Sequence, residues 1–561
     1  MPAHRRRPVG GVIAIAAAPE RAAAAPDRRR ARIARVALGA ALAVTVAPFV
    51  RTIAHVLGGA TSTSLAGDEA LAGLAVDRAG DLAQLLGPYS QWGWYHPGPA
   101  WFYLLLPVYG LGGRSGAALV AAQLTVHALS AALVVLAVHS RTAAWRAPLM
   151  AACVLAFVAR MPEQIWLKVW NPYALVLPVA LLVLLTARTV AAPASRTRWW
   201  GATVVAASFV VQSHVGTAVV AATCVVVATA ALAQPARRGR ILAALPWLAV
   251  AALAWLPPLI QQAAPPAGEP ANVTALADYF LHGDQEGAPL ADRLALAGRV
   301  LGYFPFGRAL GPLAPEVHLA SPDVLIALLI PVPVALLVVL VGRRLGERLL
   351  PALGLALAAA TVAGLASAVL LEGPLLTYVL IWLGAIPMVL LFAVLDLLAA
   401  VAADLGRRLP RPAGSRSRVH RTVAVAGTAA LLAALVGPAS ATLRDGERSR
   451  PDSVGVQRSA DRVLAVLAGI PGCARSPVLV DIGTTDRWPV ASGLAFRLER
   501  AGHPARVIGN WTLLFGSRAA ARGDEPCAVW VTDPAAADGD PLLVVDSDWG
   551  PAAVGVERRA P

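Results

Sequence analysis

Long apolar runs dominate this chain and constrain its fold more than any other feature of the sequence. An α-helix needs about 20 apolar residues to cross the hydrocarbon core of a bilayer. Only 14% of the 561 residues are charged and 57% are hydrophobic, whereas about a quarter of an ordinary soluble protein is charged. We therefore predict a mainly α fold, a polytopic transmembrane helical bundle of about 11 spans. Runs that approach or reach the required length are residues 36–56, 324–340, 375–394 and 423–436.

The basic residues predict how the bundle is oriented. The net charge is +15, but the arginines gather in short segments between the apolar runs, for example 28–35, 237–240 and 343–348. Short basic loops are retained on the cytoplasmic side of a membrane, so this pattern indicates topology and argues against a nucleic-acid partner. We predict a multi-pass protein of a bacterial inner cell membrane, with a cytoplasmic N-terminus and an extracytoplasmic C-terminal domain. The near-total use of Arg, with Lys168 as the single lysine, suggests a GC-rich bacterial genome.

One short apolar run, residues 99–111, decides the parity of the spans. About 13 helical residues reach only about 20 Å, short of the roughly 30 Å core. We therefore interpret this run as an interfacial or re-entrant helix on the outer face. All basic loops then fall on the cytoplasmic side, and the long loops 58–115 and 261–321 fall outside. The predicted division is a disordered basic tail over 1–34, a transmembrane domain over 35–442 and an extracytoplasmic α/β domain over 443–561.

The last hundred residues or so have the composition of a small soluble domain. Short β-type runs alternate with one segment of helical periodicity, which predicts a β-α-β core. The region contains neither a GxGxxG motif nor a P-loop, so nucleotide binding is not supported. The predicted strands are 478–482, 505–508, 528–532 and 542–545, and the predicted helix is 488–500, followed by Gly502 as its C-cap.

The four cysteines divide between the two predicted domains. Cys153 and Cys224 lie in apolar runs and are interpreted as inert small hydrophobic residues. Cys473 and Cys527 both fall in the C-terminal domain and are candidates for a disulfide if that domain lies outside the cytoplasm. No CxxC or His/Cys spacing indicates a zinc site.

The first outer loop carries the residues that point most clearly to chemistry. Its GDEA sequence places Asp68 and Glu69 shortly after a membrane exit, and the sequence GPYSQWGWYHPGP follows over residues 87–99. The Trp and Tyr side chains suit the headgroup layer, so part of this pattern is typical of an aromatic belt.

Residues 67–107 resemble the first periplasmic loop of GT-C fold membrane glycosyltransferases, which include the protein O-mannosyltransferases and the lipid A aminoarabinose transferases. In those families an Asp-Glu pair precedes an H/K/E-P-P-type segment and a short membrane-surface helix. The loop is similar in more detail to that of a set of actinobacterial membrane proteins carrying GDEA and GPYSxxGWxHPGP. Gly98 departs from the family pattern, in which a second proline is typical, and no acceptor motif is visible. Looser marks of resemblance are Asn171-Pro172-Tyr173, Gln212-Ser213-His214, and Tyr378 with Trp382.

The resemblance implies transfer of a sugar from a polyprenyl-phosphate donor to an extracytoplasmic acceptor, which is a cell-envelope glycan, a lipid or a protein. Asp68 matches the residue proposed as general base in these families, and a carboxylate near an acceptor hydroxyl can take its proton. The leaving lipid phosphate favours a cationic partner or a divalent cation. Asp68 and Glu69 alone are not a metal ligand set, so no metal ligand is assigned. The predicted substrate-binding residues are Glu69, Tyr89, Tyr95, His96, Arg160, Lys168, Asn171, His214 and Tyr378.

Each of these polar residues also has a structural interpretation. Side chains at the start of a helix can satisfy its free N–H groups, and long cationic side chains can reach from a helix to the membrane interface. Asp68 and Glu69 are then the cap and first-turn acid of a helix over 70–79, His96 caps a loop, Lys168 lies at the interface, Asn171 caps a helix, and His214 satisfies a tight turn. Gln261 and Gln262 in the large outer loop are expected to be solvated, with contact to the acceptor as the alternative.

The alternative function is that of a non-enzymatic membrane transporter or lipid-carrier flippase. Transporters place ionisable groups near the middle of the membrane and often consist of two related halves. Acidic residues are nearly absent from the predicted spans, and no internal repeat is apparent. A GT-C scaffold that has lost its activity and only binds glycans is a third interpretation.

Overall fold

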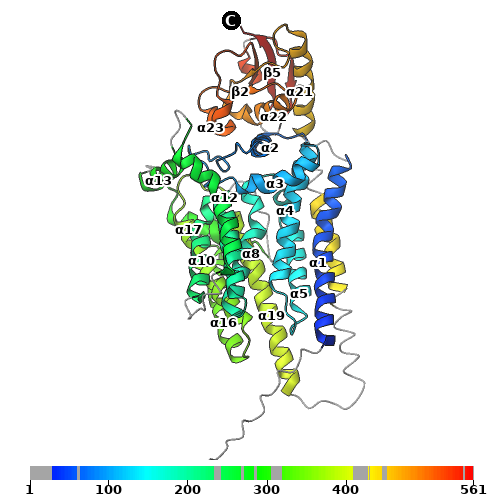
Figure 1. The fold of residues 1–561 in the computed structure, drawn as a ribbon, viewed down its shortest axis with the longest axis vertical. Coiled ribbons are helices and arrows are strands. Elements are labelled where there is room, and N and C mark those ends of the chain that lie inside the picture. The colour runs from blue at the N-terminus through cyan, green and yellow to red at the C-terminus, as the bar shows by residue number, and fades with distance from the viewer. Residues whose placement is uncertain are drawn as a thin grey trace, which may run out of the picture.

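Helices stand side by side in a bundle, and a small α/β domain lies on one end of it (Figure 1). We call this end of the bundle the domain end and the opposite one the far end. The computed structural model describes residues 28–59, 64–232, 242–266, 271–282, 287–304, 319–408, 428, 430–444, 452–537, 539–547 and 550–559.

Seven described helical segments are long and apolar enough to cross a membrane. They are Ala31–Leu57, Gly116–Ala137, Asn171–Ala191, Val215–Leu232, Pro322–Arg344, Leu349–Val369 and Thr377–Arg408. They comprise α1 (Arg28–Leu57), α4 (Gly116–Ala137), α7 (Asn171–Ala174) with α8 (Val176–Ala191), η1 (Val215–Thr217) with α10 (Ala218–Leu232), α15 (Pro322–Leu329) with α16 (Pro331–Arg344), α17 (Leu349–Val369), and α18 (Thr377–Leu380) with η2 (Ile381–Gly384) and α19 (Ala385–Arg408).

Four further helices pack in the same bundle but fall short of the length or hydropathy of a span. The seven candidate spans do not by themselves confirm the predicted number of about 11 spans, which stays a prediction. The four are α5 (Arg146–Arg160), α9 (Arg196–Ser213), α12 (Leu245–Ala263) and Ala430–Arg444.

Two short helices of the first outer loop, α2 (Gly67–Gly80) and α3 (Ala100–Leu111), lie at the domain end (Figure 1). The apolar run of residues 99–111 forms α3, which lies beneath α2 and next to the α/β domain (Figure 1). Trp101, Phe102 and Tyr109 bury one face of α3 in the bundle. Its position relative to a membrane stays a prediction. The other short helices are α6 (Gln164–Leu167), α13 (Asn272–His282) and α14 (Leu290–Gly302).

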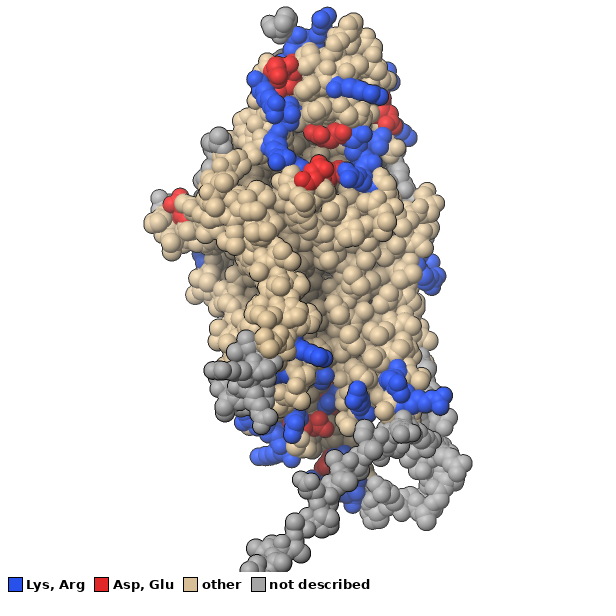
Figure 2. Space-filling model, viewed as in Figure 1, with Lys and Arg blue, Asp and Glu red and all other residues tan. Residues whose placement is uncertain are grey.

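Charge is distributed as a membrane-spanning body requires. Figure 2 shows Lys, Arg, Asp and Glu on the α/β domain and at the far end, with a broad, nearly uncharged band between them. Many large apolar side chains of the bundle are exposed, among them Leu253, Leu329 and Leu340. Exposed apolar surface of this extent is stable against lipid rather than water.

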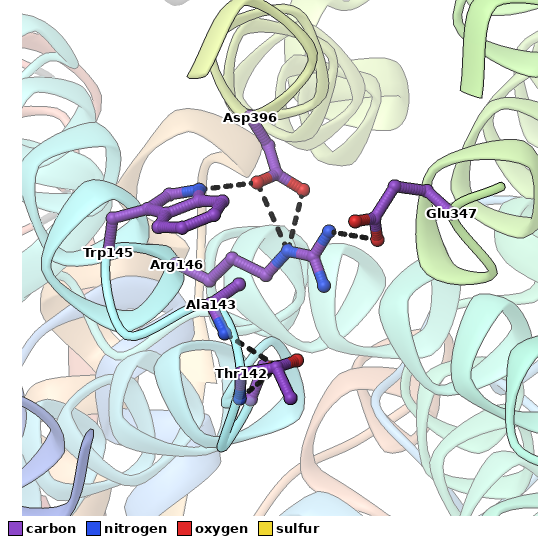
Figure 3. Close-up of polar contacts among 7 residues, drawn as sticks. Thr142, Ala143, Trp145, Arg146, Glu347 and Asp396 are labelled. Carbon is purple, nitrogen blue, oxygen red and sulfur yellow. Dashed lines mark hydrogen bonds and ion pairs between the residues drawn. The ribbon is translucent and has the colours of Figure 1, made fainter. Parts of the chain in front are cut away.

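The far end is held together by a buried ion pair between distant segments (Figure 3). Arg146, at the start of α5, donates through Nε to both carboxylate oxygens of Asp396 on α19, at 3.1 and 2.8 Å. Its Nη2 lies 3.0 Å from a carboxylate oxygen of Glu347 in the turn between α16 and α17. The indole N–H of Trp145 donates to Asp396 at 2.9 Å. Three parts of the bundle are therefore joined through one guanidinium group.

The Arg146→Met variant should unfold more readily, by about 3 kcal/mol, because it leaves Asp396 buried without its counter-ion. The double variant Arg146→Met/Asp396→Leu should recover most of this loss, since it removes both charges. Arg407→Met is the matched control, because the ion pair of Arg407 with Asp404 is exposed and is worth at most about 1 kcal/mol. Thermal unfolding of the purified protein measures all three. Equal losses of stability in Arg146→Met and Arg407→Met would contradict the stabilising role of the Arg146–Asp396 ion pair.

The C-terminal domain contains a five-stranded sheet with strand order β2-β1-β3-β5-β4. β1 pairs in parallel with β2 and β3, and β1–α22–β2 is a β-α-β unit, as predicted. β5 pairs antiparallel with β3 and β4. The elements are α21 (Asp452–Gly469), β1 (Val478–Ile482), η3 (Thr485–Arg487), α22 (Trp488–Arg500), β2 (Ala505–Arg506), α23 (Trp511–Phe515), η4 (Ser517–Ala519), β3 (Cys527–Thr532), η5 (Pro534–Ala536), β4 (Leu543–Val545) and β5 (Ala552–Arg558).

Other expectations need correction or addition. The sequence places residues 28–34 in the disordered tail, but they form the first turns of α1, while residues 1–27 lie outside the described residues. The strand β5 is absent from the prediction, and it contains Gly555, which is needed where the ring of Trp530 covers the backbone. Cys473 and Cys527 form a disulfide, with their Cα atoms 5.9 Å apart.

Candidate functional site

The N-terminal turn of α2 presents Asp68. Gly67 adopts a φ of +57°, which favours glycine, and starts the helix directly before this residue. The N-cap position is Ala66, and no side chain caps this end, so the capping interpretation of Asp68 is wrong. The Asp68 carboxylate instead accepts a hydrogen bond of 2.7 Å from the hydroxyl of Tyr89. Asp68 is half-buried and faces open space.

Burial raises the pKa of Asp68 above its ordinary value of 3.8. The positive charge of Lys168 and the hydrogen bond from Tyr89 act in the opposite direction, because both favour the carboxylate. A carboxyl group with a raised pKa and a stabilised anionic form is suited to accept a proton from a substrate.

Two cavities meet at Asp68. The larger has a volume of about 620 Å³ and the smaller about 310 Å³. Asp68, Tyr89, Trp170 and Asn171 line both of them. A molecule in either cavity can therefore reach the same carboxylate.

The larger cavity combines polar groups with an apolar wall that belongs to membrane-spanning segments. Val215, Ala218 and Val219 line it from η1 and α10, and Leu370 and Leu371 line it after the end of α17. An aromatic cluster covers another side, and the centroids of its contacting rings lie 5.0 to 6.2 Å apart. The cluster consists of Trp92, Trp94, Tyr279 and Phe280.

His96 and His214 form a pair in the larger cavity. Their rings stack with centroids 4.6 Å apart. Nδ1 of His96 accepts the N–H of Val215 at 3.2 Å, and Nδ1 of His214 accepts the N–H of Gly216 at 3.1 Å. Burial lowers the pKa of His96 well below its usual value and that of His214 to about 4. Both rings are therefore neutral near pH 7, and each carries its proton on Nε2.

The short segment before α8 is tied to α2 and to the turn after α9. The N–H of Val169 donates to a carboxylate oxygen of Glu69 at 2.9 Å, and the side-chain amide of Asn171 donates to the carbonyl of Ser213 at 2.9 Å. The ammonium group of Lys168 lies 4.7 Å from the centre of the Trp170 ring. This segment holds Lys168 close enough to influence Asp68.

The structure brings most of the predicted site residues together. Tyr89, His96, Asn171, His214 and Tyr378 line the larger cavity with Asp68, and Tyr95 lines the smaller one. Three of the predicted substrate-binding residues, Glu69, Arg160 and Lys168, line neither cavity. Glu69 is buried and holds Val169, Arg160 is exposed and its backbone carbonyl accepts the hydroxyl of Tyr303, and Lys168 lies beside the Trp170 ring.

The smaller cavity lies between α2, α3 and the C-terminal domain. Arg78 and Gln84 line it from α2 and the following loop, and Leu514, Ser517 and Arg518 line it from the domain. Gln261 lines it too, and is buried with its side-chain oxygen bound to the N–H of Asn272 at 3.0 Å, so the expectation that Gln261 is solvated is wrong.

Sequence reasoning missed every site residue that the C-terminal domain supplies. Trp488 lines the larger cavity and packs edge-on against Tyr89, with centroids 6.4 Å apart. Arg518 lines the smaller cavity. Neither belongs to a motif, and their only signal is their position in the domain that follows the last apolar run. Within the described part of the chain, no group of three or more His, Cys, Asp or Glu side chains is placed to hold a metal ion.

Gly98, where the family pattern has a proline, lies directly against Gln212. Its N–H donates to the Gln212 carbonyl at 3.2 Å, and a Cβ at this position would overlap the Gln212 side chain. Gly87 is equally constrained, since a Cβ there would meet the carbonyls of His96 and Gly98. These close approaches fix His96 beside the turn that carries His214.

Gly98→Ala should therefore destabilise the protein by about 1–3 kcal/mol, the usual effect of overpacking. The double variant Gly98→Ala/Gln212→Ala should recover stability, because it removes the side chain that the new methyl group meets. Gly110→Ala in α3 serves as control, since nothing besides its chain neighbours and the backbone of its own helix lies within 4 Å of the position that its new methyl group would take. Thermal unfolding is the measurement, and no recovery in the double variant would show that another contact is responsible.

Solved structures share this architecture, although no family model and no curated protein matches the sequence. The aminoarabinose transferase ArnT from Cupriavidus metallidurans, in its crystal structure bound to undecaprenyl phosphate, is 16% identical, with a TM-score of 0.50. This match covers 90% of this chain and 97% of that one. The same protein in the apo state is 15% identical over 93% and 97% of the two chains, with a TM-score of 0.51.

The chain has the GT-C fold. This confirms the fold that the first outer loop predicts, a polytopic helical bundle with a small C-terminal α/β domain. The Archaeoglobus fulgidus oligosaccharyltransferase in its apo form is 14% identical over 85% of this chain and 64% of that one, with a TM-score of 0.40.

Proposed function

We propose that this protein is a membrane glycosyltransferase that moves a sugar from a polyprenyl phosphate to an extracytoplasmic acceptor, with Asp68 as general base. The observation that carries the proposal is that the Asp68 carboxylate lines two separate cavities at once. A transferase needs such a junction, because donor and acceptor must meet at one catalytic group. The ArnT structure of the same fold, which holds undecaprenyl phosphate, supports the choice of donor.

The larger cavity suits the donor. An isoprenoid chain needs apolar surroundings, and residues of η1, α10 and the segment after α17 give this cavity an apolar wall. Two neutral imidazoles in this cavity, His96 and His214, offer Nε2–H groups as donors for phosphate oxygens. Lys168, beside the site, adds positive charge.

The smaller cavity suits the acceptor, since its walls include the C-terminal domain and polar side chains. An acceptor hydroxyl attacks the anomeric carbon of the donor sugar as Asp68 takes the hydroxyl proton. The new glycosidic C–O bond forms as the bond from the anomeric carbon to the phosphate oxygen breaks. The polyprenyl phosphate leaves with the electron pair and is stabilised by the imidazole N–H groups.

The disulfide and the ion pair also agree with this proposal. Disulfides persist in oxidising compartments, so the Cys473–Cys527 bond supports an extracytoplasmic C-terminal domain at the surface of a bacterial inner membrane. A transporter or flippase would use ionisable groups within the membrane. The buried ion pair of Arg146 and Asp396 instead joins α5 to α19, and neither residue lines a cavity.

Asp68→Asn should lower the rate of sugar transfer by about 10²–10⁴-fold, because an amide cannot take the acceptor proton. Asp77→Asn is the matched control, since Asp77 lies on the same helix but lines neither cavity. Transfer of radiolabelled sugar from a polyprenyl-phosphate donor to membrane acceptors, in vesicles with equal amounts of each variant, is the measurement. Undiminished transfer by Asp68→Asn would overturn the proposed mechanism.

The pH dependence provides a second test. A general base works in its ionised form, so transfer should fall as the pH drops through the pKa of Asp68, which lies above 3.8. Tyr89→Phe removes a hydrogen bond that lowers this pKa, so the acid limb of the rate profile should move to higher pH. Tyr103→Phe should leave the limb in place, because the Tyr103 hydroxyl binds the Gln84 carbonyl and not Asp68. A shift to lower pH in Tyr89→Phe would contradict the assignment of the base.

A further inference from the structure

The smaller cavity contains two guanidinium groups that the proposed transfer step does not use. Arg78 comes from α2, and Arg518 comes from η4 of the C-terminal domain. Asp68, at the other end of the cavity wall, is the only acidic residue that lines this cavity among the described residues. The charge of the cavity is therefore positive on the side of the domain.

Arg78 is held in place by bonds that use only part of its guanidinium group. Its Nε donates to the side-chain oxygen of Gln84 at 2.8 Å, and its Nη1 donates to the carbonyl of Phe515 at 3.1 Å. A guanidinium group has five N–H donors, so others remain for a ligand. No described carboxylate lies within 4 Å of Arg78, and the nearby Asp77 and Glu499 bind Tyr109 and the N–H of Ala505.

Arg518 is exposed, and only its backbone carbonyl is bonded, to Nη1 of Arg506 at 2.6 Å. Its side chain makes no hydrogen bond or ion pair with any residue of the described ranges. Burial first, and also the like charge of Arg518, lower the pKa of Arg78 to about 10. Arg78 thus remains protonated near pH 7, and an anion between the two guanidinium groups would relieve their repulsion.

The spacing along α2 sets the size of the ligand. Asp68 and Arg78 are ten residues apart, which corresponds to about 15 Å along a helix that rises 1.5 Å per residue. A ligand whose hydroxyl meets Asp68 while its anionic group meets Arg78 must be extended over this distance. A simple alcohol or a free phosphate ion cannot make both contacts.

We propose that the acceptor is an anionic glycan, bearing a carboxylate or a phosphate that Arg78 and Arg518 bind while its hydroxyl lies at Asp68. This inference rests on the proposed function and adds to it the class of acceptor. It also gives the C-terminal domain a role, because half of the anion subsite belongs to it. Guanidinium groups suit both anions, since they form paired hydrogen bonds to carboxylate and to phosphate oxygens.

Binding of defined sugars to the purified full-length protein tests this inference without the transfer reaction. Trigalacturonate is compared with neutral maltotriose, and glucose 6-phosphate with glucose, by isothermal titration calorimetry. At least one anionic probe should bind about tenfold more tightly than its neutral partner. Equal binding of the charged and neutral sugars in both pairs would overturn the inference.

Two variants test whether Arg78 and Arg518 cause the preference for anionic over neutral sugars. Arg518→Gln should reduce it several-fold without loss of folding, because Arg518 is exposed, and Arg78→Lys/Arg518→Gln should abolish most of it. Arg497→Gln, whose side chain pairs with Asp461 on the surface of the same domain, is the control and should keep the full preference. An unchanged preference in Arg518→Gln and in the double variant would overturn the inference.

The outcome is independent of the catalytic test. Asp68→Asn should keep the preference for the anionic probes, because it retains both arginines, even though it loses transfer. If the wild-type protein transfers sugar normally but shows no preference for the anionic probes, the anionic acceptor is excluded and the glycosyltransferase proposal stands.

Discussion

The position of α2 is the constraint on which the rest of the site depends. On the bundle side, the Glu69 carboxylate holds the backbone of Val169 at 2.9 Å. On the domain side, the hydroxyl of Ser492 donates to the Gly67 carbonyl at 3.3 Å, and Gly73 lies directly beneath the ring of Phe496. A catalytic carboxylate must be placed to within a fraction of an ångström. Contacts from both sides can achieve this, although α2 has no capping side chain of its own.

The two cavities differ in a way that follows from where their walls lie. Segments that can span a membrane contribute apolar side chains to the larger cavity, beside polar groups such as the neutral pair His96 and His214. The C-terminal domain carries charged residues on its surface, and Arg518 brings one of them to the smaller cavity. The proposed division between a lipid-linked donor and a polar acceptor agrees with the arrangement of bundle and C-terminal domain seen in Figure 1.

Much of the fold was predictable because bilayer-spanning helices need long apolar runs, and these are visible without any tertiary information. The segment from Asp68 to His96 was predictable as a site because its polar residues are concentrated in one loop with a family resemblance. Arg78, Trp488 and Arg518 were not, since they come together only through contacts between segments far apart in sequence. Glu69 shows the converse, as a residue within the motif that the structure uses to position the backbone.

A structure of the full chain with bound undecaprenyl phosphate tests the central claim most directly. The phosphate should lie in the larger cavity beside His96 and His214, with the isoprenoid chain leaving along α10 and the end of α17. The smaller cavity should stay open from the C-terminal domain to Asp68. A phosphate found in the smaller cavity, between Arg78 and Arg518, or a lipid bound away from Asp68, would contradict the account.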